Sequence, residues 1–472
     1  MKNFKVSVNM KSPENYIPKK VSILGAARSG LAAARFLNAR GVSVFISDSC
    51  LPDKLSEMLA KGNCSHFTNE AGEHSEKVLD TDVIVLSPGV RSNLPILLKA
   101  KELGIPVWSE IELAFRFSAA KYIAITGSTG KSTTVSMLGS ILEAANAEHV
   151  VAGNIGVPLV DVATGIGPDG FVVAEISSFQ LENIDCFRPK VGVILNLLKN
   201  HLDRYDNEEA YYDAKKIMAQ NSGFDDYIVL NADDIRLKQW AETIKNKTNV
   251  LWFGNESIPA DGAWYKDGAI YSRLNGKTER LLDVESMKLR GLHNYENASA
   301  AAIAAKLAGI DNKYIAAGLA NFSGLEHRLE FVDEINNVKY YNDSKSTTAE
   351  SITCAVSSFD HNVHLIAGGR DKGCDFSVVN DALKKYVKDI CLIGEAAARM
   401  AGLWNGCAPV KMAGSLEEAI NCCALKAVAG DVVVFSPGCS SFDMFKNFEH
   451  RGEVYKQTVR HLRKEKAGRS ER

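Results

Sequence analysis

Residues 127–133 form a glycine-rich run, Gly-Ser-Thr-Gly-Lys-Ser-Thr, with the residue types of a phosphate-binding loop. Glycines let backbone N–H groups approach an anion, and the N-terminus of a following helix favours negative charge. The lysine can neutralise the β- and γ-phosphates of ATP, and the next hydroxyl can bind Mg²⁺. The run therefore predicts an ATP site. The general pattern has glycine where this chain has Ile125, and an ordinary turn with an exposed lysine is the alternative.

Two further side chains that could bind Mg²⁺ follow apolar strands. Glu175 comes directly after the apolar run 171–174, and His201 lies beyond the apolar run 191–195. Because Mg²⁺ prefers a few oxygen ligands completed by water and phosphate, a carboxylate near the loop suits this ion. A single histidine is more often a surface or structural residue, so the sequence leaves both roles open for His201.

The elements that must position these residues alternate between strands and helices. In the first block, an apolar strand at 21–24 leads through a glycine-containing turn into a helix at 31–39 and a strand at 42–46. In the second block, a strand at 122–125 precedes the loop and a helix at 132–145 follows it. This alternation predicts an α/β fold with parallel sheets.

The third block has the same organisation. Its apolar runs are 338–341, 363–367, 390–393 and 432–435, and each ends in a polar or glycine-containing loop. Ligands of open α/β sheets bind outside the carboxyl ends of the strands. Later in the second block, residues 254–277 are expected to form a hairpin and the alanine-rich run 297–307 a helix. The predicted domains are 1–110, 111–322 and 323–472.

The composition excludes several other classes of protein. The 472 residues are 46% hydrophobic and 24% charged with a net charge of −2, as in ordinary soluble globular proteins. This charge disfavours a general nucleic-acid or membrane-surface binder, and neither 18 consecutive apolar residues nor a signal peptide is visible. The ten cysteines contain no Cys-x-x-Cys pair, which disfavours zinc and thioredoxin-like sites. We expect a cytoplasmic protein with reduced thiols that binds neither nucleic acid nor membrane.

The segments that carry chemistry occur in an order that is typical of one family. They are residues 126–133, 153–156, 175–182, 200–205, 291–295, 326–328, 342–347, 368–373, 436–438 and 440–443. On these segments the chain resembles the Mur ligases, which are ATP-dependent amide-forming enzymes of bacterial cell-wall synthesis. The resemblance spans all three blocks. It implies a Rossmann-like N-terminal domain, a central P-loop ATPase-like domain and a C-terminal Rossmann-like domain.

Within the family the chain most resembles the member that adds D-glutamate, on the turn 87–89 and the segment 442–452. The resemblance implies that ATP phosphorylates the carboxylate of UDP-N-acetylmuramoyl-L-alanine and that the amine of D-glutamate attacks the acyl phosphate. ADP and phosphate would be released in this step of peptidoglycan precursor synthesis. Two Mg²⁺ ions and a monomeric enzyme are expected. The alternatives are a sister ligase that adds L-alanine, a ligase like folylpolyglutamate synthase, and a nucleotide-binding protein without enzymatic activity.

The resemblance also implies roles for individual residues. Catalytic roles are implied for Lys131, Glu175, His201, Lys215 and Lys345. Metal ligands are implied at Ser132, Glu175, His201 and Lys215. Contacts to ATP are implied for Gly127, Ser128, Thr129, Gly130, Lys131, Ser132, Thr133, Asn294, Asn297, Arg328 and Asp343. Contacts to D-glutamate are implied for Thr347, Lys372, Ser441 and Phe448. Contacts to the UDP-linked substrate are implied for Gly25, Ala27, Arg28, Asp48, Ser87, Gly89 and Asn154.

Two features of the central block allow more than one interpretation. The resemblance implies that Lys215 is N-carboxylated, which would turn the amine into an anion able to hold a second Mg²⁺. Taken without the resemblance, the pair Lys215-Lys216 predicts a solvated face of a helix. The residues before His201 are Lys199-Asn200, where the family commonly has an acid, so the partner that orients this histidine stays open.

The first block also allows two interpretations. Its turn 25–30 is close to a dinucleotide-binding pattern, but Ala27 occupies the place of the middle glycine. Asp48, at the end of the following strand, could bind a ribose hydroxyl or the uracil. Where members of the family often have a basic residue, this chain has Ser49-Cys50, and Arg28 is expected to supply the charge.

Overall fold

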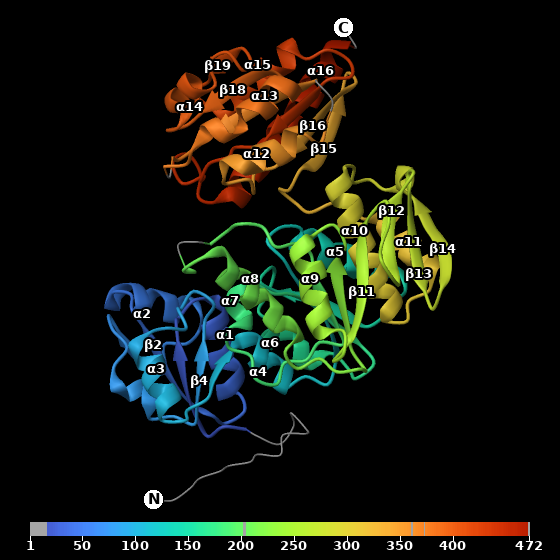
Figure 1. The fold of residues 1–472 in the computed structure, drawn as a ribbon. Coiled ribbons are helices and arrows are strands. Elements are labelled where there is room, and N and C mark those ends of the chain that lie inside the picture. Colours follow the sequence, from blue (N-terminus) through green and yellow to red (C-terminus); the bar gives the residue numbers. More distant parts are fainter. Residues whose placement is uncertain (1–16, 202–203, 360–361, 372, 471–472) are drawn as a thin grey trace, which may run out of the picture. The chain divides into compact units, whose positions relative to one another are not determined.

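The computed structural model describes residues 17–201, 204–359, 362–371 and 373–470, with side chains described as far as residue 464. These residues contain three β-sheets and divide into two compact units (Figure 1). The first unit comprises the described residues up to Met287 together with Leu292–Phe322, and the second comprises Lys288–Gly291 and the described residues from Ser323 onward. The predicted α/β class is confirmed, because each sheet is largely parallel and its strands alternate with helices. The domain boundaries stay predictions.

The first sheet has five parallel strands in the order β3-β2-β1-β4-β5. The strands are β1 (Lys20–Leu24), β2 (Ser43–Asp48), β3 (Thr68–Ala71), β4 (Val83–Leu86) and β5 (Val107–Ser109). The helices are α1 (Arg28–Asn38), α2 (Pro52–Lys61), η2 (Glu76–Leu79), α3 (Pro95–Glu102) and α4 (Glu110–Arg116). The central strands β1 and β4 are mainly apolar because they are buried on both faces. The predicted strand–turn–helix–strand unit is present, and its helix begins at Arg28, earlier than expected, because the turn ends at Ala27.

The second sheet has nine strands in the order β14-β13-β12-β11-β10-β9-β6-β8-β7. The strands are β6 (Lys121–Thr126), β7 (His149–Gly153), β8 (Phe171–Glu175), β9 (Val191–Ile194), β10 (Tyr227–Asn231), β11 (Asn249–Asn255), β12 (Gly262–Lys266), β13 (Ala269–Leu274) and β14 (Lys277–Asp283). Strands β6 to β12 pair in parallel, and β12, β13 and β14 form an antiparallel meander. The hairpin predicted at 254–277 is confirmed, and it continues into β14.

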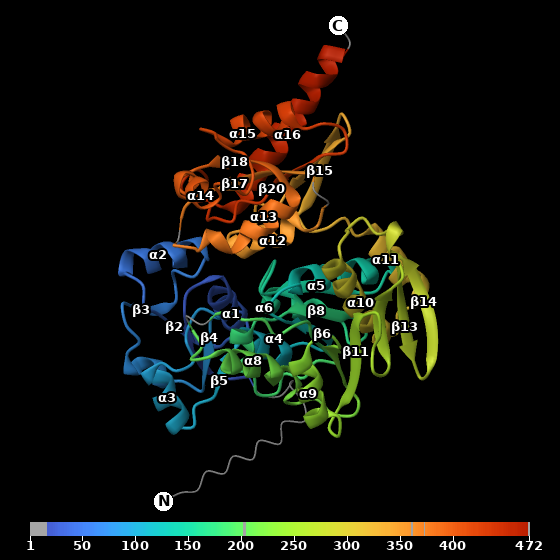
Figure 2. The ribbon, with the colours of Figure 1, turned by 45° about the horizontal axis from the view of Figure 1, so that its top comes forward.

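Helices also alternate with the strands of this second sheet. They are α5 (Lys131–Ala144), α6 (Leu159–Val162), η3 (Ala163–Gly165), α7 (Ser178–Leu181), α8 (Glu208–Lys216), η4 (Ile217–Ala219), α9 (Ile235–Ile244), η5 (Val284–Ser286), α10 (Leu292–Leu307) and α11 (Asn312–Asn321). Helices α5, α10 and α11 lie side by side (Figures 1 and 2). A Cβ on Gly318 of α11 would lie 2.4 Å from the Cα of Ile141 in α5, so the two backbones require glycine there. Helix α10, which is rich in alanine, is also buried along most of its length.

The third sheet has six strands in the order β15-β16-β20-β17-β18-β19. The strands are β15 (Glu330–Ile335), β16 (Val338–Asn342), β17 (Val363–Gly368), β18 (Val387–Ile393), β19 (Val410–Met412) and β20 (Val432–Phe435). The helices are α12 (Ala349–Val356), η6 (Phe376–Val379), α13 (Asn380–Tyr386), α14 (Ala397–Leu403), α15 (Leu416–Lys426) and α16 (Phe448–Ser470). All four predicted strands are present. Strand β15, an antiparallel edge strand with three acidic residues, was not predicted from the sequence. Among the described helices, none combines the length and the apolar composition that crossing a membrane requires.

A buried histidine lies near the amino ends of the strands in the third sheet. His364 of β17 faces Asp389 of β18 through Nδ1 at 2.8 Å, and Asp431 through Nε2 at 3.0 Å. Lys426 and Lys388 in turn pair with these two carboxylates. Burial by itself lowers the pKa of His364, but the hydrogen bonds and charges of Asp389 and Asp431 outweigh burial and raise it. Protonated His364 therefore bridges two strands at the edge opposite the carboxyl-end loops.

We expect the stability of the second unit to decrease as the pH rises through the pKa of folded His364. Because this pKa lies above the ordinary value of 6.5, the stabilisation is fully present below that value and is lost at higher pH. The free energy of unfolding should change by at most about 1.4 kcal/mol per pH unit. Urea unfolding at pH values between about 5.5 and about 9 measures this slope. His364→Gln should flatten it, and an unchanged slope in the variant would contradict the role of His364.

Candidate active site

The glycine-rich loop lies between β6 and α5, as predicted. Gly127 and Gly130 have positive φ angles of 152° and 82°. A Cβ on Gly130 would lie 2.5 Å from Oδ1 of Asn297, and one on Gly127 would lie 2.9 Å from Cβ of Leu195. Both positions therefore require glycine, and Ile125 belongs to the buried strand before the loop. Ser132 and Thr133 are buried in the first turn of α5.

The loop is held in shape by Asn196, which follows β9. The backbone N–H groups of Ser128 and Thr129 donate to its Oδ1 at 3.0 and 2.9 Å. The Ser128 hydroxyl also donates to the carbonyl of Leu198 at 2.9 Å and accepts from the N–H of the same residue. Asn196 is not among the residues predicted from the sequence. Its signal was a polar amide directly after an apolar strand that neighbours β6.

Two lysines donate to one carbonyl of this loop. Lys131 Nζ lies 2.8 Å and Lys215 Nζ 3.0 Å from the carbonyl oxygen of Gly127. Lys215 is 1% exposed, so the prediction of a solvated helix face is wrong for this residue. Helix α8 turns Lys215 inward over the ring of Tyr211, at 4.3 Å, whereas Lys216 pairs with acidic residues of α8. Burial and the nearby Lys131 charge lower the pKa of Lys215 to about 6.

A buried carboxylate lies on the strand next to the loop. Glu175 ends β8, where its backbone is paired with Ile125 of β6, and its side chain is 2% exposed. Its Oε1 accepts a hydrogen bond from Nδ2 of Asn154 at 2.8 Å. Its Oε2 has no hydrogen-bond partner among the described residues. An unpartnered buried carboxylate oxygen beside a phosphate-type loop suits a cation, so this residue fits the predicted Mg²⁺ site.

His201 is exposed and lies in a left-handed backbone conformation, with φ at 54°. Its ring contacts Phe179 and Tyr211, with centroid separations of 4.9 and 5.6 Å. Since Tyr211 also lies under Lys215, these rings connect the His201 segment with helix α8. Asn200, which stands where the family has an acid, accepts the backbone N–H of His201 at 2.8 Å.

Asn294 and Asn297, the two asparagines predicted to contact ATP, are buried in α10. Asn297 Oδ1 accepts a hydrogen bond from the Thr134 hydroxyl at 3.2 Å and lies against Gly130. Asn297 therefore supports the first turn of α5 and the end of the loop. Asn294 lies one turn earlier on the same helix.

In the first sheet, the predicted substrate residues gather around the turn after β1. Both oxygens of Asp48 accept backbone N–H groups, from Ala26 at 2.6 Å and Cys50 at 2.8 Å. Burial opposes ionisation of Asp48, but these hydrogen bonds outweigh it and lower the pKa. The Ser87 hydroxyl donates to the carbonyl of Gly25 at 2.7 Å, which joins the turns after β1 and β4. Ala27 and Gly89 are exposed on these turns, and Arg28 is exposed at the start of α1.

Polar contacts join the first two sheets beside these turns. Arg204 donates to the carbonyl oxygens of Pro88 at 2.9 Å and Val90 at 3.1 Å, and pairs with Glu182. Glu182 also accepts from the Ser92 hydroxyl at 2.6 Å. A polar cavity of about 150 Å³ lies here. The network fixes the turn of Ser87 and Gly89 relative to the segment of His201. Its contacts were not predicted from the sequence.

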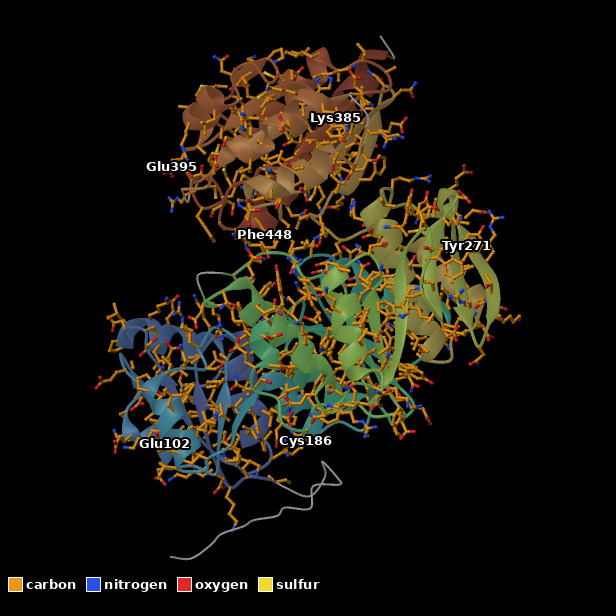
Figure 3. The ribbon with its side chains drawn as sticks, viewed as in Figure 1. Glu102, Cys186, Tyr271, Lys385, Glu395 and Phe448 are labelled. Carbon is orange, nitrogen blue, oxygen red and sulfur yellow. The ribbon has the colours of Figure 1, made fainter. Side chains whose placement is uncertain are left out.

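In the second unit, Asp343, Lys345 and Thr347 lie on the loop after β16 and Ser441 on the loop after β20, whereas Arg328 precedes β15. Asp343 accepts from the Ser436 hydroxyl at 2.8 Å and from the Leu329 N–H at 3.1 Å. Burial raises the pKa of Asp343 to about 6. Lys345 Nζ lies 5.9 Å from the ring of Phe448, which Figure 3 labels at the start of α16. Ser441 is buried, and Thr347 and Arg328 are half-buried. Lys372 lies outside the described residues.

Two other groups of acidic, histidine or cysteine side chains have the compactness of metal sites. Glu112, Asp185 and Cys186 form one, but the Arg116 guanidinium pairs with both carboxylates. The other consists of Glu326, His327 and Glu453, where the Lys456 ammonium pairs with both carboxylates. In each group a cationic side chain already neutralises the carboxylates, so we interpret both as ion-pair networks.

Three family models match the chain in order. Residues 19–109 match the Mur ligase MurD-like N-terminal domain, 125–305 the Mur ligase middle domain, and 327–439 the Mur ligase glutamate ligase domain. Two similar relatives, from Koribacter versatilis and Geotalea daltonii, are named UDP-N-acetylmuramoylalanine–D-glutamate ligase. They are 40% and 41% identical to this chain, and each match covers 94% of this chain and 98% of the relative.

Solved structures of related ligases share the fold. UDP-N-acetylmuramate-alanine ligase from Thermotoga maritima has a TM-score of 0.58 at 18% identity, covering 94% of this chain and 99% of that one. A pseudomurein peptide ligase type C from Methanothermus fervidus has a TM-score of 0.57 at 18% identity, covering 94% and 100%. At these identities the comparison supports the architecture alone.

Proposed function

This chain belongs to the Mur ligase family, and from that membership we propose that it joins D-glutamate to UDP-N-acetylmuramoyl-L-alanine at the expense of ATP. The observation that carries the proposal is the identity of about 40% to D-glutamate ligases over nearly the whole chain. Three domain matches in order support it, with division at 1–110, 111–322 and 323–472 as part of the proposal. The match of residues 19–109 disfavours a ligase like folylpolyglutamate synthase, which lacks such a first domain.

In the proposed reaction, the terminal phosphoryl group of ATP passes to the carboxylate of the alanyl residue, giving an acyl phosphate and ADP. The amine of D-glutamate then attacks the acyl carbon, loses a proton and displaces phosphate. Lys131 would neutralise the phosphates, and the position of its Nζ at the Gly127 carbonyl of the loop supports this role. The loop glycines fit where a side chain would collide with Leu195 and Asn297, and Asn196 and Asn297 keep the loop in shape.

The residues that would hold Mg²⁺ are Ser132, Glu175 and His201, and Lys215 would join them once it is N-carboxylated. Mg²⁺ neutralises the charge on the transferring phosphoryl group when bound. Glu175 supports this assignment most directly, through its buried and unpartnered Oε2. The use of two ions and the modification of Lys215 belong to the proposal, as do a monomeric state and a cytoplasmic location.

The remaining contacts are assigned by the same proposal. Asn294, Asn297, Arg328 and Asp343 would bind ATP. Gly25, Ala27, Arg28, Asp48, Ser87, Gly89 and Asn154 would bind the UDP-linked substrate. Lys345, Thr347, Lys372, Ser441 and Phe448 would bind D-glutamate or act at the reacting centre. Cationic and hydroxyl groups suit a dicarboxylate amino acid. Asp48 and Ser87 support the substrate assignment through the turn that they shape.

The amino acid that the enzyme accepts distinguishes the proposed function from the activities of the sister ligases. Purified protein is incubated with ATP, Mg²⁺ and UDP-N-acetylmuramoyl-L-alanine, and phosphate release is measured with single amino acids. We expect release with D-glutamate and none above background with L-glutamate, L-alanine or diaminopimelate. Replacing the acceptor by UDP-N-acetylmuramate tests the L-alanine-adding alternative. Turnover with L-alanine or diaminopimelate, and not with D-glutamate, would refute the assignment.

A further inference from the structure

Arg451, in the first turns of α16, is 1% exposed and points into the second unit. Its guanidinium makes three hydrogen bonds to two loops. Nε donates to the Ser344 hydroxyl at 3.1 Å, and one terminal nitrogen donates to the Ser344 carbonyl at 2.8 Å. The other terminal nitrogen donates to the Cys439 carbonyl at 3.1 Å. The guanidinium thus holds the loop after β16 against the loop after β20.

These hydrogen bonds connect Arg451 to residues that neighbour the proposed amino-acid contacts in the sequence. Ser344 precedes Lys345, and its hydroxyl donates to the carbonyl of Phe448 at 2.8 Å. Cys439 lies two residues before Ser441. The loop after β17 also approaches, because a Cβ on Gly369 would lie 3.2 Å from the guanidinium. One buried side chain therefore makes hydrogen bonds to two loops and lies close to a third, and all three leave the carboxyl ends of neighbouring strands.

Stability alone is a poor explanation for this arrangement. Among the described residues, no carboxylate lies within ion-pair distance of Arg451, and all three of its hydrogen-bond acceptors are uncharged. Burial lowers the pKa of Arg451 to about 10, and the more distant charges of Asp443 and Asp343 offset only part of this effect. A buried cation without a paired anion costs free energy, which apolar packing on α16 would not. Lys456, on the same helix, is by contrast paired with three carboxylates.

We propose that Arg451 is a positioning residue for the D-glutamate site, holding the loops of Ser344–Lys345 and Cys439–Ser441 in the conformation that binds the amino acid. The inference rests on the proposed function. A planar guanidinium has donors in a fixed fork and can reach two carbonyls and a hydroxyl on different loops at once. A lysine at this position would keep the positive charge but would lack the fixed arrangement of donors.

The test compares Michaelis constants for the three substrates in Arg451→Lys and Arg451→Gln. We expect the KM for D-glutamate to rise about 10-fold in the lysine variant and about 100-fold in the glutamine variant. The KM for UDP-N-acetylmuramoyl-L-alanine should stay within about two-fold, because all of its proposed contacts lie in the first unit. The KM for ATP should rise less than the KM for D-glutamate, because only one proposed ATP contact, Asp343, adjoins Ser344. Amide hydrogen exchange should become faster in residues 344–347 and 439–441 of both variants.

A matched control separates positioning from general stability. His364→Gln removes another buried cation from the same unit, at the opposite edge of the sheet. It should lower the melting temperature without changing the KM for D-glutamate. If an Arg451 variant fails to fold, Ser344→Ala, which removes one acceptor of Arg451, should raise the same KM about 10-fold. A wild-type KM for D-glutamate in Arg451→Lys, or equal increases for all three substrates, would overturn the proposal.

The outcome is separable from that of the proposed function. If the unmodified protein accepts a different amino acid, the proposed function fails, and the KM of that amino acid in the Arg451 variants still tests the positioning role. If the unmodified protein uses D-glutamate and the variants keep its KM, the positioning role alone fails.

Discussion

Replacing Lys215 by alanine is expected to lower turnover by about 10³-fold, because the proposal makes this residue an anionic ligand of the metal site. The surroundings of the Lys215 amine support this expectation. Lys215 Nζ is buried, donates to the Gly127 carbonyl and shares that acceptor with the Lys131 ammonium. Among the described residues no carboxylate pairs with it. An unmodified ammonium in this place would be both desolvated and repelled by its neighbour.

The same surroundings favour the carbamate. Burial and the charge of Lys131 lower the pKa of Lys215 to about 6, so the amine is mostly neutral at neutral pH. The lone pair of a neutral amine can add to carbon dioxide, forming an N–C bond and releasing one proton. The product carries a negative charge, which reverses the repulsion by Lys131 and provides oxygen ligands for Mg²⁺. The buried position and the neighbouring cation therefore both favour the proposed carbamate.

The measurement is turnover of Lys215→Ala with and without short carboxylic acids such as acetate or propionate. We expect partial recovery, because the added carboxylate can occupy the space and the charge of the missing carbamate. Lys216→Ala is the matched control, since this neighbour on α8 pairs with Glu209 and Asp213. It should keep activity within about two-fold. Full activity of Lys215→Ala would exclude the metal role, and an equal loss in Lys216→Ala would point to damage of the helix.

Lys215 also illustrates where prediction from the sequence reaches its limit. Two adjacent lysines in a polar helix have a local pattern that is typical of a solvated face. Which of them turns inward depends on the ring of Tyr211 and on the loop at Gly127, far away in sequence. The loop itself could be predicted, because strand, glycines and helix are contiguous and each has a local signal.

The same distinction holds for the rest of the fold. Apolar runs such as 432–435 coincide with β20, because a strand buried on both faces shows its burial in every residue. Strand β15 is an edge strand with acidic residues, so it has no comparable pattern. Asn196 and Arg451 act through backbone groups of distant loops, and such contacts leave no local pattern in the sequence. The family resemblance could suggest contacting residues, but not the residues that hold them in place.

Glu175→Gln is expected to lower turnover by about 10²- to 10³-fold while leaving the melting temperature unchanged or higher. The two effects have one origin. Glutamine can still accept the hydrogen bond from Asn154 at Oε1, so the local structure is kept. What is lost is the negative charge on the buried Oε2, which has no partner among the described residues. Burying an unpaired charge costs stability, and a cation at this place would recover that cost only when bound.

Glu110→Gln is the matched control for this prediction. Glu110 is also buried, accepts one backbone hydrogen bond, from Val160 at 2.8 Å, and has an Oε2 without a partner among the described residues. Burial raises the pKa of Glu110 to about 7, so the substitution removes a charge that is only partly present. It should leave turnover within about two-fold, because Glu110 lies on α4 rather than beside the loop.

Thermal denaturation without nucleotide and phosphate release at saturating substrates together distinguish the possible roles of Glu175. A metal ligand predicts lost turnover, retained stability, and a smaller rise in melting temperature when Mg²⁺ and ATP are added. A structural role predicts that stability and turnover fall together. Full turnover in Glu175→Gln would remove the residue from the site. Only the first combination explains why the chain keeps a carboxylate where a neutral side chain would be less costly to bury.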